Sequence, residues 1–524
     1  MTSPHGRMRP LHRTPRRLGD LADHLELSLT AGADVEVTGA AVGSADVEPG
    51  DLFGALPGRH AHGADFAVDA VAAGAVAILT DESGLERVRA AGVLVPVLVC
   101  PDPRRTLGTA SAWIYGHPCR GLTVVGITGT NGKTTTCYLV DAALRAAHPT
   151  TAVVGTVELK VGETSIESPR TTVESPVLHG LFALMVERGA TACAMEVSSH
   201  ALALHRVEGV EFDVVGFTNL QRDHLDFHGD METYFSEKAR LFEPGRARRG
   251  VVCVDDAWGR RLAAESRIDV DTVATLGAGD DVADAMWHVR DARIGLDGVG
   301  STFVLTGPAG ERVEAASPLP GRVNVSNAAV ALVLAYRAGV PLADAARAVA
   351  AAPGVPGRME RVVERDERRP LCLVDYAHTP DALELALGAV RPITPGRLVI
   401  VFGSDGDRDR GKRPMMGEIA ARLADVLVVT DENPRSEEPA AIRSAILEGV
   451  RRVRPDALDV HEVEPRAAAV RRALELARPE DTVIVTGKGH EPTQEVAGVF
   501  HRYNDRDVLL DAVAGPHDTT ENPA

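Results

Sequence analysis

Short, almost uniformly apolar runs alternate with helical stretches along most of this chain, and no other feature restricts its fold as strongly. "LTVVGI" (122–127) precedes the helical "TTTCYLVDAALRAA", and "LCLVD", "RLVIVFG", "DVLVVTD" and "DTVIVTG" follow after residue 358. Strands that are apolar on both faces need helices on both faces, which is typical of parallel sheets. The predicted fold class is therefore α/β, with ligands bound at the carboxyl ends of the strands.

The chain is too long for one hydrophobic core, because its 524 residues exceed the size at which single cores stop growing. The strand–helix pattern falls into three blocks, and Pro and Gly residues around 353–358 indicate a hinge between the last two. The predicted organisation is a disordered tail over 1–20, domains over 21–118, 119–355 and 356–512, and a second disordered tail over 513–524.

Composition excludes several classes of function. The formal net charge of −18 argues against a non-specific nucleic-acid binder, although local basic groups can still bind small anions. No apolar run approaches the roughly 18 residues of a membrane span. The six cysteines are scattered without a CxxC pair, and the Arg- and Pro-rich N-terminus lacks the apolar segment of a secretory signal. We therefore expect reduced thiols and a cytoplasmic protein.

The strongest local signal is "VVGITGTNGKTTT" (124–136), an apolar strand that leads through a Gly-rich turn into a helix. Gly129 and Gly132 allow backbone N–H groups to approach phosphates, Lys133 can reach phosphate oxygens and Thr134 can ligate Mg²⁺. A strict GxxxxGK spacing fails by one residue, because Ile127 occupies the first glycine position. A plain Gly-rich turn would leave the lysine unexplained, so nucleotide binding is favoured.

A second apolar strand ends in a carboxylate, Glu196, within "CAMEVSSHALALHR" (193–206). A lone acid at a strand end usually caps a helix or lies in solvent. Beside a phosphate loop, however, it is the expected second ligand of Mg²⁺.

A third segment, "FTNLQRDHLDFHGDMETYFSEKARLF" (217–242), clusters Asp223, His224 and Asp226 in a turn and places Lys238 on the following helix. Taken alone, a capped helix with surface charges explains this segment equally well.

Nine motifs in order resemble the Mur ligases over roughly residues 40–510: "GTNGKTT", "MEVSSH", "TNLQRDHLDFHG", "EKARLF", "PLPGRVNVSNA", "VDYAHTPDAL", "GDRDRGKRP", "DENPR" and "GKGHE". The resemblance implies an N-terminal domain for a uridine nucleotide, a central P-loop-type ATP-binding domain and a C-terminal Rossmann-like domain that binds an amino acid. It implies a monomeric ligase of peptidoglycan precursor synthesis that uses ATP and Mg²⁺. Its substrates would be UDP-N-acetylmuramoyl-L-alanyl-D-glutamate and diaminopimelate, joined through an acyl phosphate.

The same resemblance implies roles for individual residues. The catalytic residues would be Lys133, Glu196, His224 and Lys238, the last as a carbamate, and the metal ligands would be Thr134, Glu196, His224 and carbamylated Lys238. ATP would contact Gly129, Thr130, Asn131, Gly132, Lys133, Thr134, Thr135, Asn324, Asn327, Arg358, Asp375 and His378. The muramoyl substrate would contact Ser44, Arg59, His60, Ala61, Thr171, Thr172, Ser198 and Arg206. The amino acid would contact Arg408, Glu432, Asn433, Pro434, Arg435, Gly487 and Glu491.

The loop in "VVTDENPRSEEP" (428–439) predicts which amino acid is selected. Arg435 offers a bidentate fork to a distal carboxylate, with Asn433 and Arg408 in support, while Glu491 would take the ammonium. Diaminopimelate carries both groups, whereas lysine lacks the distal carboxylate. The alternative is a solvated loop that caps the following helix.

The chain departs from the family pattern at Gly43-Ser44-Ala45, at Val323 and at Glu432, where relatives usually have Asp-Ser-Arg, Phe and Asp. A related ligase with a different acceptor or amino acid therefore remains an alternative. A nucleotide switch would lack its Asn-Lys-x-Asp motif and leave Lys238 and His224 without a role. A catalytically inactive binder is disfavoured by the intact Lys133 and Glu196. The sequence does not distinguish meso- from LL-diaminopimelate.

Overall fold

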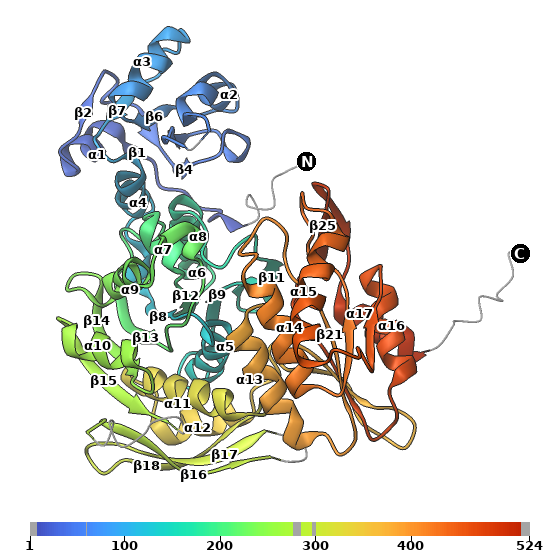
Figure 1. Ribbon diagram of the computed structural model, residues 1–524. Coiled ribbons are helices and arrows are strands. Elements are labelled where there is room, and N and C mark those ends of the chain that lie inside the picture. Colours follow the sequence, from blue (N-terminus) through green and yellow to red (C-terminus); the bar gives the residue numbers. More distant parts are fainter. Residues whose placement is uncertain (1–7, 59, 276–283, 296–299, 515–524) are drawn as a thin grey trace, which may run out of the picture.

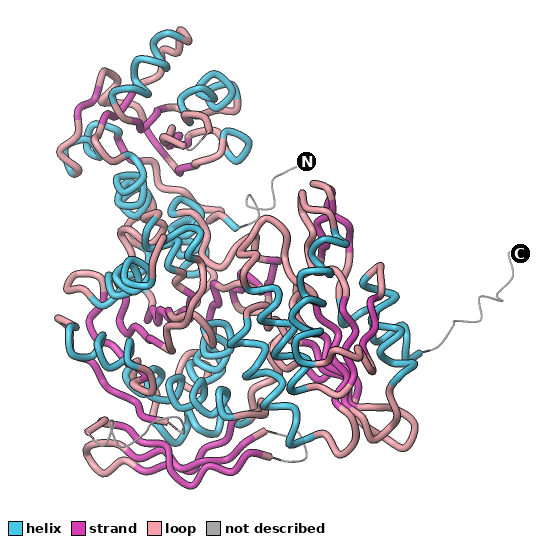
Figure 2. Tube along the Cα trace, viewed as in Figure 1, coloured by secondary structure: helices cyan, strands magenta, loops and turns pink. Residues whose placement is uncertain are grey.

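The computed structural model describes residues 8–58, 60–275, 284–295 and 300–514. Three larger sheets follow one another along the described part of the chain, each packed against helices, and two further sheets have two strands each (Figure 1). Figure 2 shows the strands of the first sheet at the top left and those of the third sheet at the right, with the strands of the second sheet spread between the middle and the bottom of the view. The α/β prediction is confirmed.

The first sheet has the order β2-β7-β6-β5-β4 and is parallel except at β2. Its two faces bury separate apolar clusters, one with Leu52 and Leu79 and the other with Phe53 and Ile78. The strands are β2 (Ser28–Leu29), β4 (Gly39–Ala41), β5 (Asp51–Gly54), β6 (Ala77–Thr80) and β7 (Val97–Val99), with β1 (Arg16–Arg17) paired to β3 (Glu36–Val37). The helices are α1 (Leu18–His24), α2 (Ala67–Ala72), α3 (Glu82–Ala90) and α4 (Pro103–Ile114).

The second sheet has eleven strands in the order β11-β10-β9-β12-β8-β13-β14-β15-β16-β17-β18. The strands are β8 (Thr123–Thr128), β9 (Thr151–Val154), β10 (Glu158–Val161), β11 (Thr164–Glu167), β12 (Ala192–Glu196), β13 (Phe212–Phe217), β14 (Ala247–Cys253), β15 (Asp269–Ala274), β16 (Trp287–Ile294), β17 (Ser301–Thr306) and β18 (Arg312–Ser317). The helices are α5 (Lys133–Leu144), α6 (Ser175–Glu187), α7 (Ser199–Ala203), α8 (Leu225–His228), α9 (Met231–Ala239), α10 (Ala257–Glu265), α11 (Arg322–Arg337) and α12 (Leu342–Ala350).

The inner strands of this sheet are parallel because they are buried on both faces. In β8, Val124 belongs to one apolar cluster, whereas Val125 and Ile127 belong to the cluster on the opposite face. The outer strands differ: β10, β11, β17 and β18 pair antiparallel with their neighbours, which the sequence analysis did not predict. These strands were not predicted because they alternate between buried and exposed residues, and half-exposed strands lack the continuous apolar run of a parallel strand.

The third sheet has the order β19-β20-β24-β21-β22-β23, with only β19 antiparallel. Its strands are β19 (Glu360–Val363), β20 (Leu371–Val374), β21 (Leu398–Phe402), β22 (Val426–Val429), β23 (Val460–Glu462) and β24 (Thr482–Val485), followed by the hairpin β25 (Thr493–Val496) and β26 (Val499–Arg502). Its helices are α13 (Pro380–Val390), α14 (Lys412–Leu423), α15 (Pro439–Val453), α16 (Arg466–Leu476) and α17 (Asp505–Ala514).

The predicted tail over residues 1–20 is wrong from residue 8 onward. Met8 is only 1% exposed, and Arg9 hydrogen-bonds to the buried Asp51. Strand β1 lies within this range, and helix α1 begins in it. The Arg- and Pro-rich composition was misleading because the residues that Arg9 and Leu11 contact lie far away in the sequence. Residues 1–7 and 515–524 lie outside the described residues.

All six cysteines are free and buried, as expected for reduced thiols. No helix among the described residues is long and apolar enough to cross a membrane.

Arg466 connects two strand-end loops of the third sheet. Its side chain is fully buried against Asp505 at 2.8 Å, and it also donates to the carbonyl oxygens of Asp431 at 3.2 Å and Thr486 at 2.8 Å. These carbonyls follow β22 and β24, so one guanidinium fixes the loops 430–435 and 486–491 relative to each other.

We expect Arg466→Met to destabilise the third sheet by roughly 3–5 kcal/mol, because it leaves the buried Asp505 carboxylate without its partner. Urea unfolding followed by circular dichroism would measure the change. Arg472→Met is the matched control, since Arg472 pairs with Glu475 at the surface and its loss should cost at most about 1 kcal/mol. Equal effects of the two substitutions would contradict the role of Arg466.

Candidate active site

The phosphate loop follows β8 at the centre of the second sheet, and α5 begins at Lys133. Gly129 and Gly132 both have positive φ angles, of 145° and 87°, and neither position has room for a side chain. A Cβ at Gly132 would lie 2.3 Å from Oδ1 of Asn327, and one at Gly129 would lie 2.0 Å from Oγ1 of Thr218. Both glycines are therefore required by the backbone path and by close packing.

Two residues after β13 support this loop, and the sequence analysis missed both. The carbonyl oxygen of Asn219 accepts from the Thr130 N–H at 2.9 Å, and its Oδ1 accepts from the Asn131 N–H at 2.9 Å. The Thr218 hydroxyl donates to the Asn131 carbonyl at 2.6 Å. The "FTN" at the end of the strand was a visible signal, since β13 is the neighbour of β8 in the sheet.

Lys133 lies over the loop that it follows. Its Nζ donates to the carbonyl oxygens of Gly129 at 2.9 Å and Thr130 at 2.7 Å. Burial lowers the pKa of this amine, which is opposed by Glu196 and Asp223. The amine is therefore held within the loop, where a phosphate group could replace the two carbonyl oxygens as its partner.

Glu196 ends β12, the other neighbour of β8, and is 1% exposed. Its Oε2 accepts from the hydroxyls of Thr134 and Thr156, each at 3.0 Å, and its Oε1 accepts from the Thr156 N–H at 2.7 Å. The structure thus brings together the predicted pair Thr134 and Glu196. Thr156 was not predicted, because it lies in a loop without a motif.

Lys238 lies directly beneath the phosphate loop. It is 1% exposed, its Nζ donates to the Gly129 carbonyl at 2.8 Å, and it lies 4.7 Å from the centre of the Tyr234 ring. Burial, with a further contribution from the nearby Lys133, lowers the pKa of Lys238 well below its usual value. The neutral amine is therefore strongly favoured compared with a lysine in water.

His224 lies in the turn before α8, where its φ of 54° is left-handed. Its ring centre lies 4.8 Å from that of His200, and His200 lies 5.4 Å from His228. Desolvation by the surrounding loops lowers the pKa of His224 below its usual value despite the neighbouring Asp223, although 44% of the side chain is exposed. The imidazole is therefore neutral near pH 7, and its nitrogen lone pair is available as a ligand or base.

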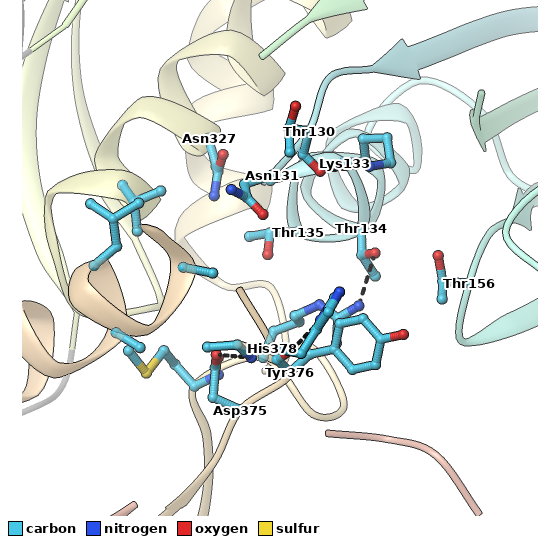
Figure 3. A pocket seen from close by; sticks show the side chains of 18 of the residues that line it. Thr130, Asn131, Lys133, Thr134, Thr135, Thr156, Asn327, Asp375, Tyr376 and His378 are labelled. Atoms are coloured by element: carbon cyan, nitrogen blue, oxygen red, sulfur yellow. Dashed lines mark hydrogen bonds between the residues drawn. The ribbon is translucent and has the colours of Figure 1, made fainter. Parts of the chain in front are cut away.

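A cavity between the second and third sheets contains most of the residues predicted to contact ATP (Figure 3). Asn131, Thr135 and Asn327 lie on one side of it, and Asp375, Tyr376 and His378 lie on the other. Of the predicted set, all but Gly129 line this cavity: Thr130, Asn131, Gly132, Lys133, Thr134, Thr135, Asn324, Asn327, Arg358, Asp375 and His378.

Arg358, at the predicted hinge, joins the two sides of the cavity. It donates to the Thr134 hydroxyl at 3.3 Å, and its guanidinium lies 4.2 Å from the centre of the Tyr376 ring. Asp375 fixes the loop beside it by accepting from the N–H groups of Met359 at 2.7 Å and Ala377 at 2.9 Å.

A second cavity adjoins the first. Asp223, His224, Tyr376 and His378 line both cavities. Of the residues predicted to contact an amino acid, Arg408, Arg435 and Glu491 line the second one. Arg435 lies 3.5 Å from carboxylate oxygens of both Asp405 and Glu495, so its guanidinium is held without a close bidentate partner.

The other predicted amino-acid contacts, Glu432, Asn433, Pro434 and Gly487, lie behind this cavity and do not line it. Asn433 donates to Oε2 of Glu491 at 3.1 Å, and the fully buried Lys488 donates to Asn433 Oδ1 at 2.9 Å and to the same Glu491 oxygen at 2.8 Å. Asn433 therefore orients Glu491, and Lys488, which was not predicted, is part of the same network.

Glu432 is 2% exposed, and its Oε2 has no hydrogen-bond partner among the described residues. Burial, reinforced by Asp405, raises the pKa of Glu432 well above its usual range. A Cβ at Gly487 would lie 2.8 Å from this oxygen, so the glycine makes room for the longer acid.

The residues predicted to hold the muramoyl peptide form a connected group next to Glu196. Thr172 donates to the Glu196 carbonyl at 2.9 Å and accepts from the Ser198 N–H at 3.1 Å, while the hydroxyl oxygens of Thr156 and Thr171 lie 3.1 Å apart. Arg206 donates to the Thr172 carbonyl at 3.3 Å.

Three arginines surround one carboxylate at this edge. Glu174 accepts from Arg170 at 2.7 Å, from Arg206 at 2.9 Å and from Arg104 at 3.3 Å. The group retains excess positive charge, which suits an anionic substrate. Arg104 and Arg170 were not predicted, since isolated arginines carry no motif.

The residues predicted to contact uridine lie apart from both cavities. Ser44 begins a 3-10 turn, Ser44–Asp46, in the first domain, and His60 and Ala61 are exposed in a neighbouring loop. Arg59 lies outside the described residues.

Comparisons with known proteins agree with this arrangement. The chain matches the Mur ligase family catalytic domain over residues 36–112, the Mur ligase middle domain over 127–335 and the Mur ligase glutamate ligase domain over 357–489. It is 49% identical over 516 residues to the UDP-N-acetylmuramoyl-L-alanyl-D-glutamate–2,6-diaminopimelate ligase of Streptomyces coelicolor, covering 98% of this chain and 99% of that one.

Two further relatives extend the comparison. The UDP-N-acetylmuramyl-tripeptide synthetase of Leifsonia xyli subsp. xyli is 46% identical and covers 95% of this chain and 96% of its own. A solved structure of a UDP-N-acetylmuramoyl-L-alanyl-D-glutamate–2,6-diaminopimelate ligase superimposes with a TM-score of 0.66 at 30% identity, over 96% of this chain and 99% of that chain. The chain belongs to the Mur ligase family, with the three-domain architecture of that family.

Proposed function

We propose that this protein is an ATP-dependent ligase that adds diaminopimelate to UDP-N-acetylmuramoyl-L-alanyl-D-glutamate, forming the UDP-muramoyl-tripeptide of peptidoglycan precursor synthesis. One observation carries the proposal: the cavity at the phosphate loop and the cavity at Arg435 share four lining residues. An acyl phosphate formed in the first cavity would therefore meet an amine held in the second. Relatives with the same activity in their names match over nearly the whole chain.

The nucleotide step uses the phosphate loop and Lys133. The exposed side of the loop would bind the phosphates of ATP, and Lys133 would exchange its two backbone carbonyl partners for phosphate oxygens. The substrate carboxylate then attacks the γ-phosphorus, which gives an acyl phosphate and ADP. Lys133 and Arg358 lie where they would stabilise the charge that develops during transfer.

The donor set fits Mg²⁺, which prefers hard oxygen ligands and usually binds through one or two carboxylates together with substrate phosphates. The Thr134 hydroxyl and the Glu196 carboxylate supply such oxygens 3.0 Å apart. Among the residues that the structure describes, no three His, Cys, Asp or Glu side chains form a metal cluster. When bound, the ion would neutralise phosphate charge.

Lys238 is suited to carbamylation. A neutral amine attacks the carbon of CO₂ and loses one proton, which gives a carbamate with two hard oxygens. Burial favours the neutral amine of Lys238, and the neutral His224 lies in the adjoining turn. We propose that the carbamate and His224 hold a second Mg²⁺.

The second cavity has separate groups for the two ends of diaminopimelate. Arg435 would exchange its 3.5 Å contacts with Asp405 and Glu495 for a bidentate pair with the distal carboxylate. Oε2 of Glu491 is occupied by Lys488 and Asn433. Oε1 accepts a 3.3 Å hydrogen bond from Tyr376 and would take the ammonium. Lysine would leave Arg435 unpaired and would be rejected.

We propose, from the family resemblance alone, that the enzyme acts as a monomer. Six reduced, buried cysteines and the use of ATP support a cytoplasmic location.

Phosphate release tests the proposed reaction. With ATP, Mg²⁺ and UDP-N-acetylmuramoyl-L-alanyl-D-glutamate, we expect release only when a diaminopimelate isomer is added, and little with L-lysine. Arg435→Met should raise the KM for diaminopimelate at least about 100-fold, since a charge-assisted bidentate pair is lost. The control Arg472→Met should not change it. Release with lysine, or with no amino acid, would refute the assignment.

Lys238→Ala should lower turnover by about three orders of magnitude, because the carbamate and its metal are lost. Incubation of the wild-type protein with carbon-13 bicarbonate should give a carbamate signal in the carbon-13 NMR spectrum that is absent in the variant. Lys160→Ala, on β10, is the control and should retain both the signal and turnover. Full activity of Lys238→Ala would rule out the carbamate.

A further inference from the structure

The segment from Met8 to Arg13 alternates between two domains. Met8 belongs to the apolar cluster of the second domain that includes Phe182 and Met185. The N–H groups of Leu11 and His12 donate to the Glu187 carboxylate on α6 of the same domain, at 2.7 and 2.9 Å. Between these contacts, Arg9 points into the first domain, and after them Arg13 pairs with Glu48 there.

Arg9 is almost completely enclosed, with 9% of its side chain exposed. Its Nη1 donates to both carboxylate oxygens of Asp51, at 2.9 and 2.7 Å, and Asp51 is fully buried at the start of β5. A Cβ at Gly39 would lie 2.4 Å from Asp51 and 3.3 Å from Arg9, so the pair needs a glycine beside it.

The second terminal nitrogen of the Arg9 guanidinium, Nη2, hydrogen-bonds to both ends of a short loop. Nη2 donates to the carbonyl oxygen of Ala40 at 3.3 Å and to that of Asp46 at 3.0 Å. Ala40 is in β4 and Asp46 ends the 3-10 turn Ser44–Asp46, so the guanidinium closes the segment 41–45. Ser44 lies within this closed segment.

The same guanidinium faces the second domain. Arg9, Ala40 and Asp46 line a cleft whose other wall includes Arg170 and Glu174. Arg170 and Glu174 belong to the arginine-rich group beside Thr172 and Arg206. The Ser44 loop and the muramoyl-peptide residues are therefore connected through the position of Arg9.

We propose that Arg9 is a positioning residue for the uridine end of the substrate, which it serves by holding the Ser44 loop closed and by setting the first domain against the second. This inference rests on the proposed function, because it takes Ser44 as a substrate contact. Arg9 needs no contact with the substrate itself. Its loss should weaken binding of the uridine nucleotide and leave the ATP site unchanged.

Isothermal titration of the full chain with UDP-N-acetylmuramoyl-L-alanyl-D-glutamate, and separately with ATP, tests the inference. Arg9→Met should raise the Kd for the muramoyl substrate about tenfold or more and change the Kd for ATP less than about twofold, as expected when one ordering group is lost. Arg17→Met is the matched control, because Arg17 follows this segment in β1 but pairs with Asp34 at the surface. It should leave both constants unchanged.

A double variant separates positioning from folding. Arg9→Met leaves the Asp51 carboxylate buried without its cation and should lower Tm, whereas Arg9→Met/Asp51→Asn removes that charge and should recover most of the loss. The double variant should still bind the muramoyl substrate weakly, because the Ala40 and Asp46 carbonyls remain unclamped. Recovery of wild-type affinity, or an equal loss of ATP affinity, would overturn the role of Arg9. Failure of the wild-type chain to bind the muramoyl substrate would overturn the proposed function itself.

Discussion

Two lysine amines, the buried Lys238 and the half-buried Lys133, donate to the same backbone oxygen, the carbonyl of Gly129, and the active site is organised around this contact. Lys133 reaches it from α5 at 2.9 Å, and Lys238 reaches it from α9 at 2.8 Å. Two cations so close together in a buried site would repel each other strongly. The repulsion adds to burial in lowering the pKa of Lys238 and so favours the neutral amine that CO₂ requires. The arrangement depends on β8 lying between β12 and β13, since these neighbours supply Glu196 and the Thr218–Asn219 support of the loop.

The third domain completes the site that the phosphate loop begins. Arg358 binds the Thr134 hydroxyl and stacks over Tyr376, so it connects the two domains beside the phosphate loop. Tyr376 then contacts Glu491 in the adjoining cavity, and Arg466 fixes the two loops that carry Arg435 and Glu491. A short series of contacts therefore leads from the phosphate loop to the amino-acid cavity. Placing the acyl phosphate beside the amine, with little water between them, is the contribution such an arrangement makes to the rate.

Sequence patterns predicted those parts of the site that lie within one continuous motif. The loop 129–135 and Glu196 could be predicted because strand-end residues of adjacent parallel strands meet at one edge. Thr156 and Lys488 could not be predicted, because each acts through a partner that only the fold brings close. Thr156 contacts Glu196, which is 40 residues away in the sequence, and Lys488 contacts Asn433, which is 55 residues away. Residues 8–20 were misjudged for the same reason: Arg9 binds a partner 42 residues away and Leu11 one 176 residues away. Glu432 does not line the cavity, and its extra length is accommodated beside Gly487, which the sequence could not show.

The central claim is that the substrate carboxylate is activated by phosphoryl transfer before the amine attacks. Oxygen-18 in the D-glutamyl carboxylate of UDP-N-acetylmuramoyl-L-alanyl-D-glutamate tests this claim directly, because an acyl phosphate transfers one carboxylate oxygen to phosphate when the amine displaces it. Mass spectrometry of the inorganic phosphate released during turnover with diaminopimelate should show one oxygen-18 atom per phosphate. Unlabelled phosphate, with all of the label retained in the peptide product, would contradict the account.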